Sequence, residues 1–180
     1  YFYKNPEPFY EFARDFINLE KKITPTKSHR FIAKLEETGK LKGVITQNID
    51  SLHQKAGSKN VLELHGSFWH SHCLKCQEDF TYGELKEKVL EETVAHCQCG
   101  GVIKPNIVFF GENAMNLEEA SRIARNADVF LVIGSSCTVF PAAMLPEYTE
   151  GEVIIINQGR VARDYPNLSL MINEDIDTFL

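Results

Sequence analysis

The apolar residues at the start of the chain recur with the spacing of amphipathic helices. One apolar face follows the Pro-Glu-Pro run at residues 6–8 and consists of Phe9, Phe12, Ala13, Phe16, Ile17 and Leu19. A second face follows Pro25 and Thr26, ends before Gly39, and consists of Phe31, Ile32 and Leu35. Since residues three or four positions apart lie on one side of a helix, the pattern predicts two helices.

Short apolar runs separated by polar segments follow these helices. We expect strands at 44–46, 61–64 and 107–110, a helical turn at 51–55 and a charged helix at 82–92. Toward the C-terminus we expect a helix at 117–125, a strand at 128–133, a short helix from Pro141, strands at 153–156 and 170–172, and a helix from Glu174. Such alternation of strands and helices is typical of α/β folds with a parallel sheet.

Composition and charge narrow the functional classes. The 180 residues carry 19 Lys and Arg against 25 Asp and Glu, which gives a net charge of −6. With 43% hydrophobic residues the chain has the composition of a globular protein, which excludes disordered and collagen-like classes. The basic residues are spread along the chain without a Lys/Arg block. Because nucleic-acid binding needs a concentrated positive surface, we expect no direct nucleic-acid partner.

Nothing in the apolar pattern indicates a membrane segment or a secretory signal. The longest strongly apolar runs, at 129–133 and 153–156, are far shorter than the roughly 20 residues that a membrane-spanning helix needs. The chain does not open with a basic segment followed by an apolar one. We therefore expect a cytoplasmic protein without membrane association.

Four of the five cysteines lie in one short segment, unlike the dispersed, even-numbered set of a disulfide-bonded protein. Cys73 and Cys76 have a two-residue spacer, and Cys97 and Cys99 follow after a gap of 20 residues. Zinc takes four tetrahedral nitrogen or sulfur ligands, which two such pairs supply. Because the protein fills all four positions, the single Zn²⁺ predicted here is structural.

The spacing of the second cysteine pair leaves the identity of one zinc ligand open. Only one residue separates Cys97 from Cys99, whereas His96 and Cys99 have the usual two-residue spacer. A set of three cysteines with His96 in place of Cys97 is therefore an alternative to the all-cysteine set. We prefer the all-cysteine set.

Polar residues follow three of the predicted strands. Gln47, Asn48 and Asp50 come after the strand at 44–46, His65 follows 61–64, and Gly134-Ser-Ser136 follows 128–133. In an open parallel sheet, ligands bind outside the carboxyl ends of the strands. Taken singly, a histidine at a strand end is also a common structural residue, and Gly-Ser-Ser is also a plain turn. These residues alone leave both interpretations open.

Several motifs occur in a fixed order along nearly the whole chain. They are Thr46-Gln-Asn-Ile-Asp-Ser-Leu-His53, Glu63-Leu-His65-Gly66, the paired cysteines, Lys104-Pro-Asn-Ile-Val-Phe-Phe-Gly-Glu112, Gly134-Ser-Ser136 and Ile156-Asn157. In this combination the chain resembles the sirtuins, a family of NAD-dependent protein lysine deacylases.

The resemblance implies an α/β architecture with two domains. It predicts a Rossmann-like parallel sheet, which lacks its first strand and phosphate loop, and a small domain made of a zinc ribbon and a helical portion. The expected segments are 1–35 for the helical portion or connection, 36–67 for the first half of the large domain, 68–104 for the zinc ribbon, and 105–180 for the second half of the large domain.

For the NAD site the resemblance implies specific roles. His65 would be the general base that acts on a ribose hydroxyl, a suitable task for an imidazole. Asn48 would lie near the reacting ribose, Gln47 would bond its hydroxyls, and Ile49 and Asp50 would bind the nicotinamide carboxamide. The residues that match the adenosine side are Gly134, Ser135, Ser136, Asn157 and Gln158.

The second implied ligand is an acyl-lysine protein or peptide. The residues that match its groove are Val108, Phe110, Gly111, Glu112 and Val139. The implied reaction transfers the acyl group of lysine to ADP-ribose and releases nicotinamide. Two alternatives remain, namely mono-ADP-ribosyl transfer from NAD to a protein, and a catalytically silent zinc-ribbon module that docks acyl-peptides.

The sequence departs from the sirtuin pattern at its beginning. The family's Gly-Ala-Gly phosphate loop and its Pro-Asp-Phe-Arg type motif occur nowhere in the chain, which starts with Tyr1. Helix dipoles and backbone N–H groups at such loops bind pyrophosphate. We therefore expect the chain to be a fragment of an active protein, and the 180 residues alone to bind NAD poorly.

Overall fold

The computed structural model describes residues 2–180, so the first residue of the expected helical segment lies outside the described residues. The chain divides into two compact units. Unit 1 comprises the described residues up to Thr24, together with Asn48–Ser51 and His65–Asn113. Unit 2 comprises Pro25–Gln47, Leu52–Leu64 and Ala114–Leu180. These boundaries differ from the expected segment limits at 35, 67 and 104, and the assignment of segments to family domains stays a prediction.

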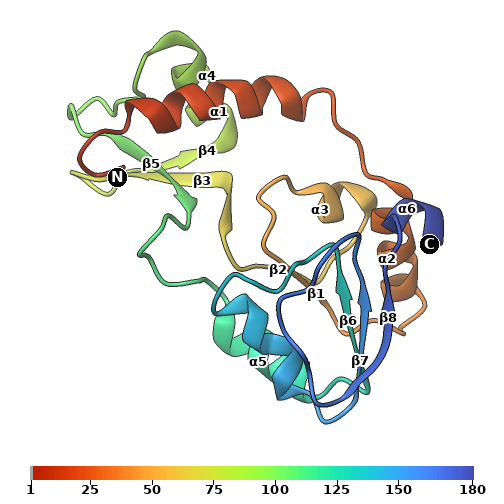
Figure 1. Cartoon of the computed structure of the whole chain (residues 1–180). Coiled ribbons are helices and arrows are strands. Elements are labelled where there is room, and N and C mark those ends of the chain that lie inside the picture. Colours follow the sequence, from red (N-terminus) through yellow and green to blue (C-terminus); the bar gives the residue numbers. More distant parts are fainter. Residues whose placement is uncertain (1) are drawn as a thin grey trace. The chain divides into compact units, whose positions relative to one another are not determined.

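Unit 1 consists of a three-stranded antiparallel sheet and two helices (Figure 1). The strands, in the order β4-β3-β5, are β4 (Asp79–Thr81), β3 (Gly66–Cys73) and β5 (Ile103–Ile107). The helices are α1 (Glu7–Glu20) and α4 (Tyr82–Glu91). Helix α4 begins at a capping box, because the Thr81 side chain accepts from the Glu84 N–H and the Glu84 carboxylate accepts from the Thr81 N–H.

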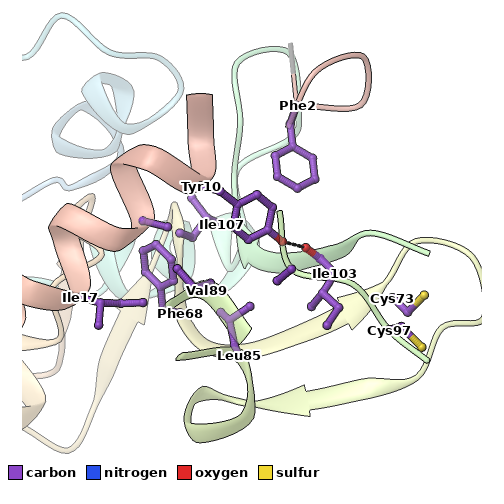
Figure 2. Close-up of a cluster of buried hydrophobic side chains, with 12 residues drawn as sticks. Phe2, Tyr10, Ile17, Phe68, Cys73, Leu85, Val89, Cys97, Ile103 and Ile107 are labelled. Atoms are coloured by element: carbon purple, nitrogen blue, oxygen red, sulfur yellow. Dashed lines mark hydrogen bonds between the residues drawn. The ribbon is translucent and has the colours of Figure 1, made fainter. Parts of the chain in front are cut away.

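The core of unit 1 lies between α1, α4 and the sheet, as Figure 2 shows. From α1, Tyr10, Ala13 and Ile17 are fully buried, at the spacing that the sequence predicts. The Tyr10 hydroxyl donates a hydrogen bond to the carbonyl oxygen of Ile103, which ties α1 to β5. The side chains of Cys73 and Cys97 lie at the edge of this cluster and point away from it (Figure 2).

Unit 2 contains two parallel sheets, which confirms the parallel α/β class expected from the alternation of elements. One sheet pairs β1 (Val44–Thr46) with β2 (Val61–Glu63), and the other has the order β6-β7-β8, as Figure 1 shows. The strands of the second sheet are β6 (Val129–Ile133), β7 (Glu152–Ile156) and β8 (Leu168–Ile172). The helices are α2 (Lys27–Glu37), α3 (Leu52–Ala56), α5 (Leu117–Arg125), the 3₁₀ helix η1 (Ala142–Tyr148) and α6 (Ile176–Phe179).

Two buried clusters hold unit 2 together. One consists of Val132, Cys137, Ala143, Val153, Ile155 and Tyr165, around β6 and β7. The other consists of Leu64, Ala120, Ala142 and Leu145, and joins the end of β2 to α5 and η1. Helix α6 is attached to the start of α2, because the Asp177 carboxylate accepts hydrogen bonds from the N–H and the hydroxyl of Ser28.

The secondary structure of unit 1 differs from the sequence-based expectation at 107–110 and at strands β3 and β4, which the sequence does not predict. The strand expected at 107–110 is wrong, because β5 already ends at Ile107 and a turn follows in which the Glu112 N–H donates to the Phe109 carbonyl. Gly111 takes a φ of +92°, which a continuing strand does not allow. Strand β3 is not predicted by the sequence, since its alternation of polar and apolar residues is irregular. Within the described residues, none of the helices combines the length and the apolar character needed to cross a membrane.

Candidate functional site

The four grouped cysteines form a compact sulfur cluster in unit 1. The Sγ atoms of Cys73, Cys76, Cys97 and Cys99 all lie within 4.8 Å of one another. Two of the Sγ–Sγ distances, from Cys73 to Cys99 and from Cys76 to Cys97, are 3.5 Å. A zinc ion with Zn–S bonds of about 2.3 Å separates its ligands by about 3.8 Å, so these spacings fit a tetrahedral metal centre. All four cysteines are free thiols.

Backbone groups and a glycine shape the cluster for thiolates. The Cys73 Sγ accepts from the N–H groups of Lys75 and Cys76, at 3.3 and 3.5 Å. Burial raises the pKa of the Cys73 thiol, but these N–H groups, together with hydrogen bonds from the Cys99 and Cys76 side chains, outweigh it and lower the pKa to about 6. Gly101 passes so close that a Cβ atom there would lie 2.5 Å from the Cys73 Sγ. The donors and the space around them therefore suit a soft divalent metal such as zinc.

His96 lies outside this cluster. Among the described residues, the group of potential metal ligands contains the four cysteines and does not include His96. The exposed imidazole of His96 lies 3.5 Å from the Glu92 carboxylate. Cys97 is buried, and its Sγ donates to the Glu78 carboxylate at 3.0 Å, which raises the pKa of the Cys97 thiol. The geometry therefore favours the all-cysteine set over the alternative with His96.

The strand ends of the β1-β2 sheet set the positions of Asn48 and His65 along the chain. Thr46 of β1 pairs with Glu63 of β2 in parallel register. Asn48 follows Thr46 by two residues, and His65 follows Glu63 by two residues. Gln47 belongs to unit 2, whereas Asn48 and His65 belong to unit 1. Asn48 and His65 therefore follow paired positions of β1 and β2 at equal distances along the chain, and their roles stay predictions.

Within unit 1, residues 48–51 lie beside β3. The Trp69 indole N–H donates to the Ser51 hydroxyl at 2.7 Å, and Ser51 adopts a φ of +57°. This segment lines a small pocket. The lining residues are Phe16, Glu20, Ile49, Asp50, Ser51, Phe68, Trp69 and Tyr82. Ile49 and Asp50, the two residues expected at the nicotinamide carboxamide, therefore share one pocket.

In unit 2 the residues expected at the adenosine side meet at one sheet edge. Ile133 of β6 pairs with Ile156 of β7, and the Gly134 N–H donates to the Ile156 carbonyl at 2.9 Å. Gly134 adopts a φ of +63° and begins a turn beside Ile156. Asn157 follows Ile156 directly, so it lies close to this turn. Asn157 is buried, whereas its neighbour Gln158 is exposed. Ser135 and Ser136 continue the same turn, and the Ser135 hydroxyl accepts from the Cys137 N–H at 3.2 Å.

The residues expected at the acyl-lysine groove occur in both units. In unit 1, residues 108–112 form the loop after β5, and the Val108 N–H donates to the His65 carbonyl at 2.9 Å. Phe110 at the tip of this loop is fully exposed. Val139 belongs to unit 2, where it is also exposed. The loop and the candidate base His65 are thus joined through their backbones.

No role is predicted from the sequence for Tyr3, or for Lys104, which only begins one of the sirtuin-like motifs. The structure buries the Lys104 ammonium group beside the 108–112 loop, and the Tyr3 hydroxyl donates to Glu112 at 2.6 Å. Lys104 lies in β5 between Ile103 and Pro105, which are both buried, and it needs a partner because an isolated buried charge is unstable.

Together these features define an α/β protein with parallel sheets, polar strand ends and a tetracysteine metal centre. Its sequence matches the model of the Sir2 family over residues 1–141. It is also 42% identical to an NAD-dependent protein deacetylase of Thermotoga maritima, over 99% of this chain and 75% of that protein. A second NAD-dependent protein deacetylase, from Sulfurisphaera tokodaii, is 40% identical over 100% of this chain and 73% of its own length. The chain therefore belongs to the Sir2 family, the sirtuins.

Solved structures agree with this family assignment. A structure described as Sir2Tm bound to a propionylated peptide has a TM-score of 0.92 and 42% identity, covering 99% of this chain and 77% of its own. Another, described as Sir2 with a p53 peptide and NAD⁺, has the same score and identity and covers 99% and 76%. The fold expected from the sirtuin resemblance is thereby confirmed.

Proposed function

We propose that this protein is an NAD-dependent protein lysine deacylase, which transfers the acyl group of acyl-lysine to ADP-ribose and releases nicotinamide. Membership of the Sir2 family and relatives named as NAD-dependent protein deacetylases support this activity. The structural observation that carries the proposal is the parallel pairing of Thr46 with Glu63, after which Asn48 and His65 follow at equal distances along the chain.

In the proposed reaction, different residues of the chain have different roles. NAD as co-substrate supplies the ADP-ribosyl group that accepts the acyl oxygen. His65 removes a proton from a ribose hydroxyl, and Asn48 with Gln47 orients that ribose. Ile49 and Asp50 hold the nicotinamide carboxamide, because the Asp50 carboxylate can accept from its NH₂ group and the Ile49 backbone N–H can donate to its oxygen.

The remaining site residues bind the two ends of the ligands. Proposed contacts to the adenosine side come from Gly134, Ser135, Ser136, Asn157 and Gln158, which gather at the ends of β6 and β7. Proposed contacts to the acyl-lysine substrate come from Val108, Phe110, Gly111, Glu112 and Val139. An extended peptide gains affinity by pairing its backbone with such a loop, and neighbouring side chains then select what it carries.

A structural zinc ion completes the proposal. Cys73, Cys76, Cys97 and Cys99 would hold it, since their four sulfur atoms fit its preferred tetrahedral coordination. All four ligand positions come from protein, so the ion stabilises the fold of unit 1 and is not needed for the proton transfer at His65.

We also place the protein in the cytoplasm. Five free thiols, four of them grouped as metal ligands, suit a reducing compartment better than an oxidising one.

Nicotinamide release from NAD, measured with and without an acetyl-lysine peptide, tests the proposed activity. We expect peptide-dependent release that His65→Ala reduces at least about 100-fold, since a general base contributes about 10²–10⁴-fold. The assay is run on the protein as it occurs naturally. Glu119→Gln, at an exposed ion pair on α5, serves as the charge-loss control.

The fate of the ADP-ribosyl group separates deacylation from its nearest rival. With NAD labelled in the adenosine moiety, deacylation places the label on a small acyl-ADP-ribose, whereas ADP-ribosyl transfer places it on protein. Label on protein, or no nicotinamide release by the zinc-loaded natural protein, would overturn the proposal.

A further inference from the structure

The loop at 108–112 is closed into a turn by reciprocal hydrogen bonds. The Glu112 backbone N–H donates to the Phe109 carbonyl at 2.9 Å, and the Phe109 N–H donates to the Glu112 carboxylate at 3.0 Å. Gly111 permits this turn with its φ of +92°. Phe110, between the two bonded residues, therefore projects fully into solvent.

A buried cation lies under this turn. The Lys104 side chain is only 7% exposed, and its ammonium group donates to the Glu112 carboxylate at 3.2 Å and to the Ile107 carbonyl at 3.0 Å. The same ammonium group lies 4.8 Å from the centre of the Phe109 ring. Lys104 thus contacts the turn through a charge pair, a backbone acceptor and a cation–π contact.

A residue from the start of the chain completes the network. The Tyr3 hydroxyl donates to the second oxygen of the Glu112 carboxylate at 2.6 Å. The neighbouring Phe2 ring stacks on Phe109 with a centroid distance of 4.9 Å. The Glu112 carboxylate therefore accepts three hydrogen bonds, from Tyr3, Phe109 and Lys104, all within unit 1.

These contacts leave the Glu112 carboxylate engaged within the protein. We propose that Lys104, Glu112 and Tyr3 form a positioning network that holds the turn 109–112 in the shape that binds acyl-lysine, so that Glu112 acts on the substrate indirectly. This inference rests on the proposed deacylase function and refines the role assigned there to Glu112. Groups that contact the substrate directly would then be the backbone of the turn and the side chains of Val108 and Phe110.

Single substitutions that remove a charge or a hydrogen-bond donor from each member test the network. Glu112→Gln removes the charge paired with Lys104 and leaves one carbonyl oxygen in place of the two carboxylate oxygens that accept from Tyr3 and from Phe109. Lys104→Met removes the cation, and Tyr3→Phe removes one donor. We expect Glu112→Gln and Lys104→Met to raise the KM for an acetyl-lysine peptide about tenfold, and Tyr3→Phe about threefold. The kcat and the KM for NAD should stay within about twofold of the values of the unmodified protein. The substitutions weaken peptide binding equally in the ground state and the transition state, which raises the KM for peptide and leaves kcat unchanged.

Hydrogen exchange of the loop amides gives a readout that needs no activity. The Phe109 and Glu112 N–H groups are bonded inside the turn, so they should exchange at least about tenfold faster in Glu112→Gln than in the unmodified protein. Glu119→Gln, which breaks an exposed ion pair with Arg122 on α5, is the matched control and should change neither readout. Glu112→Ala, which also removes the acceptor, should show larger effects than Glu112→Gln.

The outcomes separate this inference from the proposed function. If Glu112→Gln and Tyr3→Phe match the control in both peptide KM and loop exchange, the network does not position the loop and the inference fails. If the unmodified protein releases no nicotinamide, the proposed function fails, and loop exchange alone decides whether the network orders the turn. Should Lys104→Met not fold, the Glu112 and Tyr3 variants carry the test.

Discussion

Gly101 is the position at which one added carbon should discriminate best between a metal centre and a mere group of thiols. An alanine Cβ at Gly101 would lie 2.5 Å from the Cys73 Sγ, 2.6 Å from the Lys75 Cβ and 3.3 Å from the Cys99 Sγ. Ordinary contacts begin at 3.4 Å, so the Cys73 sulfur would have to move by about 1 Å. Zinc sites tolerate deviations of only about 0.2 Å in their bond lengths.

This displacement sets the expected size of the effect. Overpacking of a well-packed site costs about 1–3 kcal/mol, and we expect most of that cost to fall on the metal-bound state. Gly101→Ala should then weaken zinc binding by about 5- to 150-fold. Competition between the protein and a coloured zinc chelator measures this change directly, and elemental analysis of the purified protein gives the bound zinc.

The neighbouring glycine supplies the control. Gly100 has a φ of +78° but no atom within 4 Å of an added Cβ. Gly100→Ala should therefore cost about 1–2 kcal/mol of folding stability through backbone strain, with no direct contact to the sulfur atoms. Zinc affinity equal in Gly101→Ala and the unmodified chain would refute the reasoning, as would a Gly100→Ala variant that loses zinc to the same degree.

Two further predictions concern the packing of each unit. Tyr10→Phe should destabilise the protein by about 1–3 kcal/mol, seen as a lower midpoint in urea unfolding, because the Ile103 carbonyl loses a buried donor; an unchanged midpoint would show that water replaces it. The hydroxyl and N–H of Ser28 hold the pKa of the Asp177 carboxyl below its usual range, so this contact stabilises the fold at neutral pH and is lost as the pH falls through the lowered pKa. Asp177→Asn should therefore flatten the fall in stability measured below about pH 4, and an unaltered acid limb would contradict this.

The elements that the sequence predicts well are those with strong local periodicity. Tyr10 and Ile17 are buried on α1 as their spacing indicates, and β6 and β7 pair in parallel as the alternation of strands and helices predicts. The strand predicted at 107–110 is wrong because Val108-Phe-Phe has the composition of a strand, whereas the hydrogen bonds of Glu112 fold it into a turn. Strand composition alone cannot reveal a side chain that competes for the backbone.

In the candidate site, too, the sequence predicts residues that local patterns mark and misses contacts between residues far apart in the chain. Asn48 and His65 can be located from the sequence because they follow strands directly, and the cysteine spacing locates the sulfur cluster without any knowledge of the fold. Tyr3 and Glu112 are 109 residues apart, so their contact depends on tertiary packing that no local pattern encodes. Lys104 is missed for a related reason, since hydropathy assigns a lysine to the surface and its burial is permitted only by partners from elsewhere.

The metal centre and the proposed reaction site are connected through two strands of unit 1. Strand β3 begins directly after His65 and ends at Cys73, and β5 pairs with it from Cys73, opposite Ile103, to Gly66, opposite Ile107. The 108–112 loop continues from the Ile107 end of β5, so the sulfur cluster lies at one end of this strand pair and both His65 and the loop lie at the other. Zinc therefore has no need to contact a substrate in order to influence catalysis. In Gly101→Ala, displacement of Cys73 should weaken the pairing of β3 with β5. The KM for acyl-peptide should then rise in parallel with the loss of zinc. Gly100→Ala should leave that KM unchanged.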